Sequence, residues 1–399
     1  MRKLLVLPLA FLLLGSASLS FAQTPATPEI QVNVETEGHQ MLPQVAMNAL
    51  GDFVVVWGSR ERQDVVGEIS LHARRFAADG TPETDEILVH ENVGDSVETA
   101  VAMMEDGSFV VIYAGGLEDF VTGEITTTVF EGRRFAADGA PLGEPFAIGP
   151  RRNARNLSIA ARPEGGFVVA WEARRQAREV FVRIFDGDGS PVRNEISVAE
   201  GNGPALDVGP EGEIVVAWMA TEPGGPRRRY FVALQRFSPN GDQEGRRQRV
   251  SNNSPNFLHS IRIAKNETGS FTVLWGGVFN HVYRGILARR YSPNGAPLTR
   301  IERLDSSGAE REIAPDRNGD FVLLWSGGTE SDDGLEVLGR KYRSHLHPTR
   351  RVFRVNTTRR GHQREVAVAD DMAGNFVVVW QSEEEDSSDS DVFARVFRR

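Results

Sequence analysis

The chain has 399 residues, 25% of them charged, and no cysteine, which excludes a disulfide framework and a lipid anchor on cysteine. Its formal net charge of −10 argues against a surface built as a nucleic-acid track. Positive charge is almost entirely arginine, since lysine occurs only at Lys3, Lys265 and Lys341. Two explanations stay open for this bias: genomic base composition, and a preference for forked contacts to anions.

Residues 1–22 have the pattern of a cleaved secretory signal peptide: a basic start, an apolar run from Leu4 to Leu14, and small residues before the cleavage point. The run is shorter than the roughly 20 residues that span a bilayer, and no comparable run follows. We therefore expect export to the periplasm or the cell exterior, with residues 23–28 as a short linker.

A motif of the form Gly-Xaa-Phe-Val-Val-Val-Trp, first seen at Gly51–Trp57, recurs through the rest of the chain. Its seven copies end at Trp57, Tyr113, Trp171, Trp218, Trp275, Trp325 and Trp380. The mean spacing is about 54 residues, and such a period is typical of a solenoid, a propeller or an array.

Each repeat can be divided into four strands. The motif is a continuous apolar run, so we expect its strand to be buried on both faces between neighbouring sheets, and its aromatic residue to pack there rather than in a sugar-stacking ring. Recurrent Asp-Gly and Asn-Gly pairs supply the positive φ of tight turns between the third and fourth strands. The sixth repeat lacks this pair and has His345 and His347 instead.

The two ends of the chain do not contain whole repeats. The seventh repeat ends after its third strand, while Glu29–Val32 precedes the first repeat like an isolated fourth strand. Val32, Asn33 and Gly38–Gln40 have the same spacing as Val355, Asn356 and Gly361–Gln363. An N-terminal strand that completes the last sheet closes a ring.

The prediction is an all-β, seven-bladed β-propeller with four antiparallel strands per blade, in a single domain of residues 29–399. The predicted blades cover residues 44–89, 99–148, 157–198, 205–250, 260–304, 312–355, and 364–397 plus 29–32.

These motifs resemble the repeats of many secreted bacterial β-propeller proteins. The resemblance rests on the Gly-Xaa-Gln loop, the Gly-Xaa-Phe-Val-Val-Val-Trp strand, and an Arg-Xaa-Phe strand followed by Asp-Gly. Its clearest copy is Phe376–Ser382, and it covers 29–399. The resemblance implies the fold and export, and it carries no catalytic residues.

Binding residues are expected on the long loops that share one face, near the central channel. A basic sector there contains Arg151, Arg152, Arg155, Arg174, Arg175, Arg178, Arg227, Arg228 and Arg229, and from it we take Arg174, Arg175, Arg227, Arg228 and Arg229 as candidate ligand-binding residues. Two interpretations stay open: an anion site for acidic polysaccharide, lipopolysaccharide phosphate or nucleic acid, or a solvated surface paired in part with Glu172, Glu179 and Glu222.

Further candidates lie on the same face. His39 and His362, together with His281, are the only general bases expected there by residue type. Asp386, Asp389 and Asp391 are candidate calcium ligands, the alternative being a flexible Ser-Asp-rich loop. No other cofactor is expected.

No sequence pattern of a serine triad, a zinc helix or a phosphate loop occurs. We expect a monomeric, non-catalytic binding or scaffold module for an envelope protein or polysaccharide. The alternative is a carbohydrate-active hydrolase or lyase with its site at the central channel.

Overall fold

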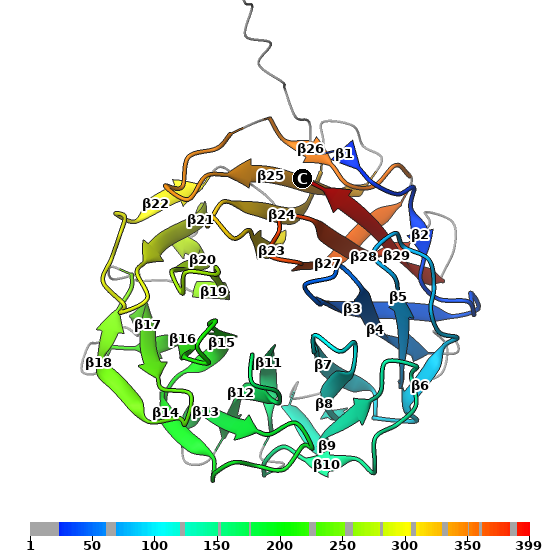
Figure 1. Cartoon of the computed structure of the whole chain (residues 1–399), viewed down its shortest axis with the longest axis horizontal. Coiled ribbons are helices and arrows are strands. Elements are labelled where there is room, and N and C mark those ends of the chain that lie inside the picture. The colour runs from blue at the N-terminus through cyan, green and yellow to red at the C-terminus, as the bar shows by residue number, and fades with distance from the viewer. Residues whose placement is uncertain are drawn as a thin grey trace, which may run out of the picture.

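The computed structural model describes residues 24–60, 69–119, 124–150, 153–174, 177–222, 229–251, 258–279, 282–304, 309–328, 334–349, 351–358, 361–383 and 389–399. Within these ranges every regular element is a β-strand. The sheets stand around a central channel, each with one strand beside the channel and one at the periphery (Figure 1). The chain is therefore an all-β propeller.

In chain order the strands are β1 (Thr24–Pro25), β2 (Ile30–Gln31), β3 (His39–Met47), β4 (Phe53–Arg60), β5 (Ser70–Phe76), β6 (Ile87–His90), β7 (Ser96–Met103), β8 (Phe109–Asp119), β9 (Glu124–Phe135), β10 (Phe146–Ala147), β11 (Arg155–Ala161), β12 (Phe167–Arg174), β13 (Arg178–Phe185), β14 (Ile196–Glu200), β15 (Asn202–Val208), β16 (Ile214–Thr221), β17 (Tyr230–Phe237), β18 (Gln243–Arg249), β19 (Leu258–Lys265), β20 (Phe271–Phe279), β21 (Val282–Tyr291), β22 (Glu302–Leu304), β23 (Ala309–Pro315), β24 (Phe321–Gly328), β25 (Leu335–Tyr342), β26 (Phe353–Arg354), β27 (His362–Asp370), β28 (Phe376–Glu383) and β29 (Ser390–Arg398).

The sheets are not all separate. Five four-stranded blades are formed by β7–β10, β11–β14, β15–β18, β19–β22 and β23–β26, and the remaining strands form one nine-stranded sheet. In that sheet a single parallel bridge between Ser390 and His39 joins β27-β28-β29 to β3-β4-β5-β6. The prediction of seven separate blades is therefore wrong: there are five, because β29 begins early enough for the Ser390 N–H to donate to the Gly38 carbonyl at 3.2 Å.

Packing follows the sequence repeat more closely than hydrogen bonding does. The described buried hydrophobic residues form seven clusters, each between neighbouring repeats. The innermost strands contact one another in a closed cycle, β3–β7–β11–β15–β19–β23–β27–β3. The motif strand serves two clusters at once: Val54 and Val56 pack toward the second repeat, and Phe53, Val55 and Trp57 pack toward the seventh. We call these seven clusters the inter-repeat layer.

The N-terminal segment closes the ring. Ile30 and Gln31 pair with Ala394 and Phe393 of β29, which confirms the prediction that the strand within residues 29–32 completes the last sheet. Residues 24–25, which the sequence assigned to a linker, form β1 and pair with the same strand. The early strands of the chain thus lie beside its last one (Figure 1).

The two matching asparagines do the same work at the two ends of the chain. The Asn33 side-chain oxygen accepts the Val392 N–H at 2.8 Å, and that of Asn356 accepts the Val337 N–H at 2.9 Å. Each therefore caps the start of a third strand, which is why the motif occurs once before β3 and once before β27.

The turn of the sixth repeat keeps the geometry of the others without their glycine. Leu346, at φ 67°, takes the place that Gly80 fills at φ 85° in the first repeat. Its side chain is buried in the cluster between the fifth and sixth repeats. Burial of the apolar side chain therefore offsets the cost of a left-handed conformation, which is roughly 1–2 kcal/mol.

In four repeats an arginine of the third strand bonds to the preceding repeat. The Arg133 guanidinium lies 5.5 Å from the Phe135 ring centroid and donates to the Val89 carbonyl of the preceding repeat at 2.7 Å. Equivalent bonds join Arg74 to Val32 (3.0 Å), Arg183 to Ile148 (2.7 Å) and Arg395 to Val355 (2.6 Å). A planar guanidinium can stack and donate in its plane at the same time, which an ammonium cannot. These ties give part of the arginine bias a structural use that the sequence analysis did not anticipate.

Candidate functional site

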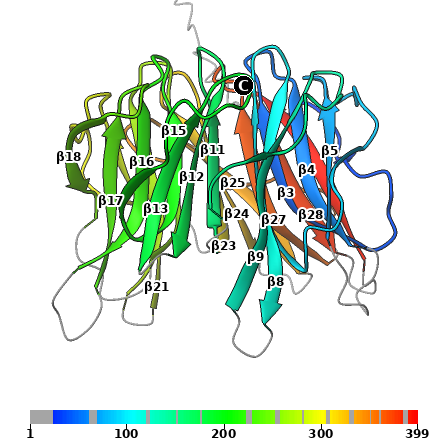
Figure 2. The same ribbon diagram turned by 90° about the horizontal axis from the view of Figure 1, so that it is seen from below.

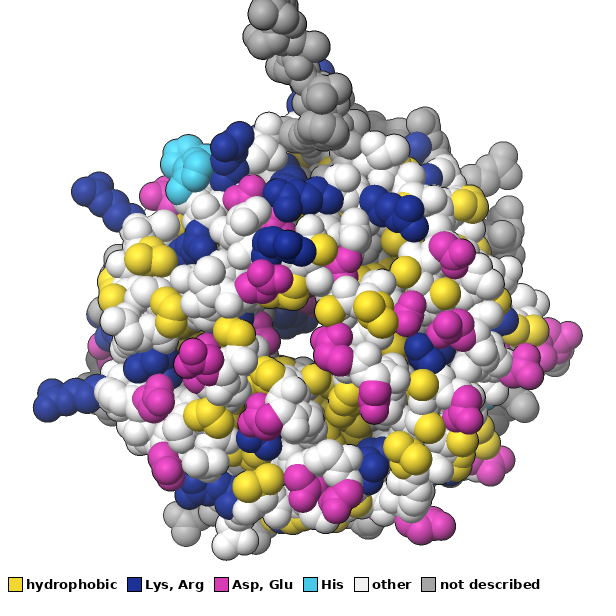
Figure 3. Space-filling view, in the orientation of Figure 1, with side chains coloured by type: hydrophobic (Ala, Val, Ile, Leu, Met, Phe, Trp, Pro, Cys, Tyr) yellow, Lys and Arg dark blue, Asp and Glu magenta, His cyan; other side chains and the backbone are white. Residues whose placement is uncertain are grey.

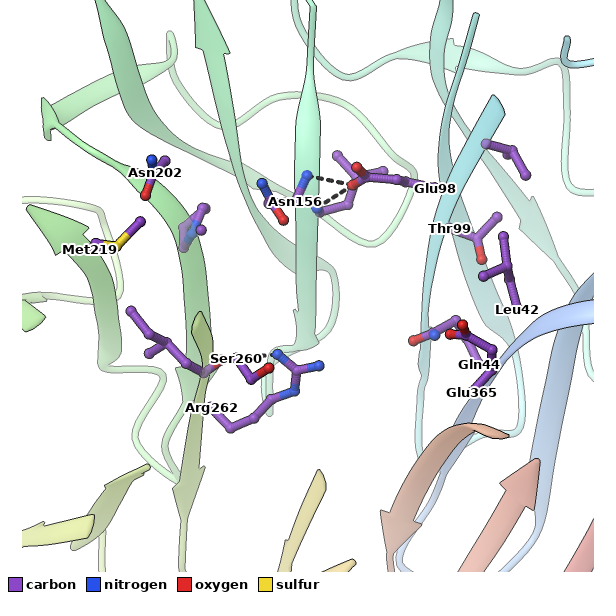
Figure 4. A pocket seen from close by; sticks show the side chains of 15 residues that line it. Leu42, Gln44, Glu98, Thr99, Asn156, Asn202, Met219, Ser260, Arg262 and Glu365 are labelled. Carbon is purple, nitrogen blue, oxygen red and sulfur yellow. Dashed lines mark hydrogen bonds between the residues drawn. The ribbon is translucent and has the colours of Figure 1, made fainter. Parts of the chain in front are cut away.

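A cavity of about 440 Å³ lies in the central channel. The residues that line it lie near the starts of the innermost strands. At that end of a repeat the first strand begins and the second ends, since His39 of β3 pairs with Arg60 of β4. At this end the second strands end and the third strands begin, as β8 and β9 do at the bottom of Figure 2. The lining residues are Leu42, Gln44, Val97, Glu98, Thr99, Asn156, Leu157, Asn202, Gly203, Pro204, Met219, Ser260, Ile261, Arg262 and Glu365 (Figure 4).

Backbone distortions surround the cavity. Six innermost strands carry a shift of register near their starts. At five of these shifts one residue has positive φ: Leu42 (54°), Asn156 (51°), Gly203 (58°), Ser260 (52°) and Glu365 (52°). Such a residue costs roughly 1–3 kcal/mol when it is not glycine, and clustering of these residues is typical of functional sites. All five line the same cavity.

These shifts also explain why the innermost strands begin earlier than predicted. β3 begins at His39 instead of residue 44, and β27 at His362 instead of residue 364. An extra residue in one strand interrupts the two-residue alternation on which the sequence analysis relied.

The strand of the second repeat, β7, has no such shift and instead contributes Glu98. The Glu98 Oε2 atom accepts the N–H groups of Asn156, in the distorted start of β11, and of Leu157, the latter at 3.4 Å (Figure 4). Burial raises the pKa of Glu98, and the two amide bonds and Arg155 oppose that rise. One repeat thus stabilises the bulge of the next with a carboxylate.

A second carboxylate does the same between the third and fourth repeats. Glu172 is 2% exposed; its Oε2 accepts the Gly203 N–H at 2.8 Å and its Oε1 accepts Arg178 at 2.6 Å. Beside it, the Asn202 side-chain oxygen is buried and has no hydrogen-bond partner among the described residues.

The one cationic side chain among the lining residues, Arg262, is strongly paired. Its Nε donates to both carboxylate oxygens of Glu312 at 2.9 and 2.8 Å, and its Nη2 donates to the same group at 2.5 Å. Its Nη1 donates to the Ile261 carbonyl at 3.0 Å. The pair raises the pKa of Arg262, so the guanidinium is a fixed part of the wall.

The channel's other end opens at the centre of the face in Figure 3, where side chains of both charge signs surround it. Asp207, in β15, and Asp370, in β27, are half-buried toward this end. Burial raises the pKa of Asp207 to about 6 and holds that of Asp370 well above its usual value, which the charge of Asp207 raises further. A cavity of about 10 Å³, enough for roughly one water molecule, lies beside Asp370 and Asp316.

The predicted basic sector is only partly described, and neither of its two described candidates, Arg174 and Arg229, lines the cavity. Arg174 ends β12 and pairs in register with Arg178, whose guanidinium binds Glu172. The Arg229 carbonyl accepts the Glu222 N–H at 2.8 Å. Arg175, Arg227 and Arg228 lie outside the described residues. Of the pairing that the sequence analysis left open, the Arg178–Glu172 pair occurs. The Glu222 carboxylate pairs instead with Arg249, which is not part of the predicted sector, at 3.2 Å.

The two candidate histidines begin innermost strands instead of lying on loops, and neither lines the cavity. His39 Nδ1 is 3.3 Å from Ser390 Oγ, and burial lowers the pKa of His39. His362 is exposed, and its Nδ1 accepts the Leu335 N–H at 3.3 Å. His281 lies outside the described residues.

The predicted calcium ligands are not brought together as a site in the described part of the chain. The Asp391 carboxylate accepts the Asn33 side-chain N–H at 2.6 Å. The negative charge of Asp389 raises the pKa of His39, against the larger effect of burial. Asp386 lies outside the described residues. Among the described residues no three acidic, histidine or cysteine side chains are grouped to hold a metal. Calcium binding stays a prediction.

The recurrent aromatic residues lie in the inter-repeat layer. Trp57, Tyr113, Trp171, Trp218, Trp275, Trp325 and Trp380 are each at most 4% exposed. Gln40 and Gln363, from the Gly-Xaa-Gln loops, accept the indole N–H groups of Trp57 at 3.0 Å and Trp380 at 2.9 Å. None of the seven lines the cavity.

Sequence reasoning missed the residues that do form the site. Glu98 gave one usable signal, a carboxylate inside an otherwise apolar strand. Arg262 and Asn202 gave none, because they were assigned to the loops and first strands of different repeats, and only the ring brings them together.

The chain resembles solved structures in fold. No protein-family model matches it, and no curated protein matches its sequence. A protein of unknown function from Dyadobacter fermentans is 11% identical with a TM-score of 0.57, over 93% of this chain and 98% of that one. The β-propeller domain of the Trilobed protease from Pyrococcus furiosus is 9% identical with a TM-score of 0.53, over 90% and 95%. That domain has an open velcro topology, whereas here β1 and β2 pair with β29.

These likenesses support the propeller fold and nothing beyond it. In the described part of the chain no helix has the length and apolar character needed to cross a membrane.

Proposed function

We propose that this protein is an exported, non-catalytic binding module that holds a polysaccharide or an envelope protein at the long-loop end of its channel. The cavity of about 440 Å³ carries the proposal. Its volume lies in the range of ligand sites, roughly 300–1,000 Å³. Its wall comes from six of the seven innermost strands, so it is a property of the closed ring.

The chemistry of the wall favours binding over turnover. Glu98 and Arg262 are held by backbone amides and by Glu312, so their charged groups are pre-organised parts of a rigid surface. Polar atoms from several strands converge on one volume, which suits a ligand with many hydroxyl or amide groups.

One observation favours the alternative of a hydrolase or lyase. Glu98 and Glu365 both line the cavity, and the raised pKa of Glu98 is what a general acid needs. We rank this second, because the Glu98 carboxylate already accepts two amide N–H groups of the neighbouring repeat.

Export rests on residues 1–22, whose basic start, apolar run and small residues before the cleavage point fit a secretory signal. Their structure lies outside the described residues. Determining the N-terminal sequence of the protein recovered from cell fractions tests this part of the proposal.

A glycan array combined with an activity screen on polysaccharides tests the binding function. Thr99→Trp places a large side chain in the cavity, and Val192→Trp, at an exposed position on the periphery, is the matched control. We expect the wild type and V192W to retain a glycan that T99W releases, with unchanged melting temperatures. Equal retention by T99W would place binding elsewhere. Turnover that Glu98→Gln abolishes would make the protein an enzyme.

A further inference from the structure

The fourth repeat departs from the others in its outer half. Two residues before the last aromatic of the third strand, the other six repeats have arginine and the fourth has Gln235. Six residues after that aromatic, five repeats have a proline, which forms a bridge like that of Pro82 with Phe76, and the fourth has Gln243. Both departures thus fall on the same blade, β15–β18.

The two glutamines together shape the outermost strand of that blade, β18. The Gln235 Nε2 donates to the Glu244 carbonyl at 3.1 Å, and its Oε1 accepts the Gln243 Nε2 at 3.0 Å. Because no proline intervenes, pairing with β17 continues directly from the turn, and Gln235 fills the shift of register that follows. β18 therefore has seven residues, whereas the outermost strands β6, β10, β14, β22 and β26 have two to five.

The outer side of β18 is an open sheet edge. Among the described strands only β17 pairs with it, and it lies at the periphery of the ring (Figures 1 and 2). An outermost antiparallel strand leaves about half of its backbone N–H and C=O groups without a partner in the sheet. A bulge at Gly245, with φ 66°, bends the strand, so the segment offered beyond it is Arg246–Arg249.

The side chains of this segment carry an excess of positive charge. Three of its four residues are arginine, and all three are exposed. Arg249 pairs with Glu222 at 3.2 Å. Arg246 and Arg247 have no ion pair within the ranges that the structure describes, and the one acidic residue of the strand, Glu244, pairs with an arginine of β17 at 3.2 Å. Two guanidinium groups therefore remain for a partner.

The sign of these charges decides which strand can pair with the edge. Charged side chains on a sheet edge normally prevent pairing with another chain. Here they exclude a second copy of β18, because like charges directly opposite each other destabilise a strand pair. They admit a strand that carries carboxylates, since a guanidinium forms forked hydrogen bonds with a carboxylate. A polypeptide also supplies backbone N–H and C=O groups at the spacing of the open edge, which a polysaccharide does not.

We infer that β18 is the docking edge for an extended acidic segment of a partner protein, which adds to the fourth blade as a fifth strand. The carboxylates of that segment pair with Arg246 and Arg247 while its backbone pairs with the open edge. This edge lies outside the ring and is separate from the cavity in the channel. None of its arginines belongs to the basic sector that the sequence analysis selected.

Three capped octapeptides with a fluorescent label serve as probes, and anisotropy titration at low salt gives their Kd. The first alternates threonine and glutamate, and the second alternates threonine and lysine. The third is the first with N-methyl groups on its threonine amides, which removes the backbone donors along one edge. We expect the first to bind at least about tenfold more tightly than each of the others. Salt should weaken its binding, because screening weakens charge pairs.

The variants separate this edge from the rest of the molecule. Arg246→Gln combined with Arg247→Gln should weaken binding of the glutamate peptide about tenfold. Arg303→Gln, an exposed arginine of the outermost strand β22, is the matched control and should change nothing. Gln243→Pro introduces the proline of the other repeats and should also weaken binding, because it shortens the edge.

Melting curves show that each variant is folded. Thr99→Trp should bind the peptide as the wild type does, so a failure of this inference stays distinct from a failure of the channel function.

Three results would overturn the inference. If the N-methylated peptide binds as tightly as its parent, the arginines attract charge alone, as they would attract an acidic polysaccharide. If sedimentation shows a dimer that Q243P dissociates, the edge pairs with a second copy of the chain. If the glutamate peptide does not bind, or binds equally to the wild type and the double arginine variant, β18 is a solvated edge.

Discussion

The inter-repeat layer and the channel wall are built from the same repeats but differ in how they use them. In the inter-repeat layer a buried aromatic ends the motif strand of each repeat, and in four repeats an arginine of the third strand donates to a carbonyl of the preceding repeat. In the channel wall the same backbone feature carries a different side chain each time. Leu42, Asn156, Gly203, Ser260 and Glu365 occupy equivalent distortions.

This difference separates positions that serve packing between repeats from positions that packing leaves free to differ. Identical contacts in the inter-repeat layer are what a stack of equal units needs, because each unit must bury the same face of its neighbour. Variation at a strained backbone position has no such benefit for packing. The channel wall differs from repeat to repeat. Glu98 comes from β7, the one innermost strand whose described pairing has no shift of register. We expect a ligand to contact this part of the molecule.

Truncating a side chain of the inter-repeat layer should give the largest loss of stability. Trp171 is fully buried in the cluster between the second and third repeats, and Trp171→Ala should lower the free energy of unfolding by about 3–5 kcal/mol. Urea unfolding measures this. Thr99→Ala, in the channel wall, is the contrasting change and should cost far less. A loss below about 1 kcal/mol for W171A would show that the layer does not dominate stability.

Asp207, in the channel, should make the free energy of unfolding depend on pH. The pKa of Asp207 is raised to about 6 in the folded protein from 3.8, mainly by burial. The folded state therefore holds a proton that the unfolded state releases, so stability should fall as pH rises from about 4 to 6. At 1.4 kcal/mol per pH unit the loss is about 3 kcal/mol.

Asp207→Asn isolates this contribution, because it removes the titration and keeps one oxygen for the Lys265 or Val208 amide. We expect the difference in unfolding free energy between wild type and variant to favour the wild type more at pH 4 than at pH 7.5. Asp370 titrates in the same direction, and because the charge of Asp207 raises its pKa, the variant lowers the pKa of Asp370 as well. Parallel curves for the two proteins would contradict the assignment.

Much of the fold could be predicted because repetition averages out local ambiguity. One apolar run is compatible with several structures, but seven at a similar spacing, most of them with a turn signal after them, fit few architectures. The matching Asn33 and Asn356 motifs also revealed the displaced strand. The bridge between Ser390 and His39 left no trace in the sequence, since it depends on how far two strands from opposite ends of the chain extend.

The site could be predicted in place but not in composition. A position near the channel follows from the fold, whereas the residues that line it come from strands 50 or more residues apart: Glu98 acts on Asn156, and Arg262 on Glu312. The sequence analysis gave weight to clusters of like charge on loops, such as Arg227–Arg229. Neighbours in sequence are easy to see, but neighbours across a ring are not.

Ligand affinity, unlike stability of the inter-repeat layer, should depend on the charge of Glu98 in the channel wall. Burial raises the pKa of Glu98, so its carboxylate gains its negative charge at a higher pH than an exposed glutamate does. Arg155 and Glu172 act on the same carboxylate. Affinity for a positively charged ligand should therefore be higher at neutral than at acidic pH. Calorimetry on wild type and E98Q tests this, since a variant with the same pH dependence would assign the effect to another group.

The smallest expected effect returns to the inter-repeat layer. Arg133→Lys keeps the charge but loses the flat stacking on Phe135 and the in-plane bond to the Val89 carbonyl, so it should cost about 1 kcal/mol. Arg246→Lys, on the exposed strand β18, is the matched control and should change stability by less than about 0.5 kcal/mol. Chemical unfolding of the two variants compares them directly. If both lose the same amount, the guanidinium ties between repeats contribute nothing that lysine cannot supply, and the abundance of arginine reflects base composition instead. If only R133K loses stability, the bonds to the preceding repeat require arginine at this position. Ligand affinity in the channel should remain unchanged in either variant.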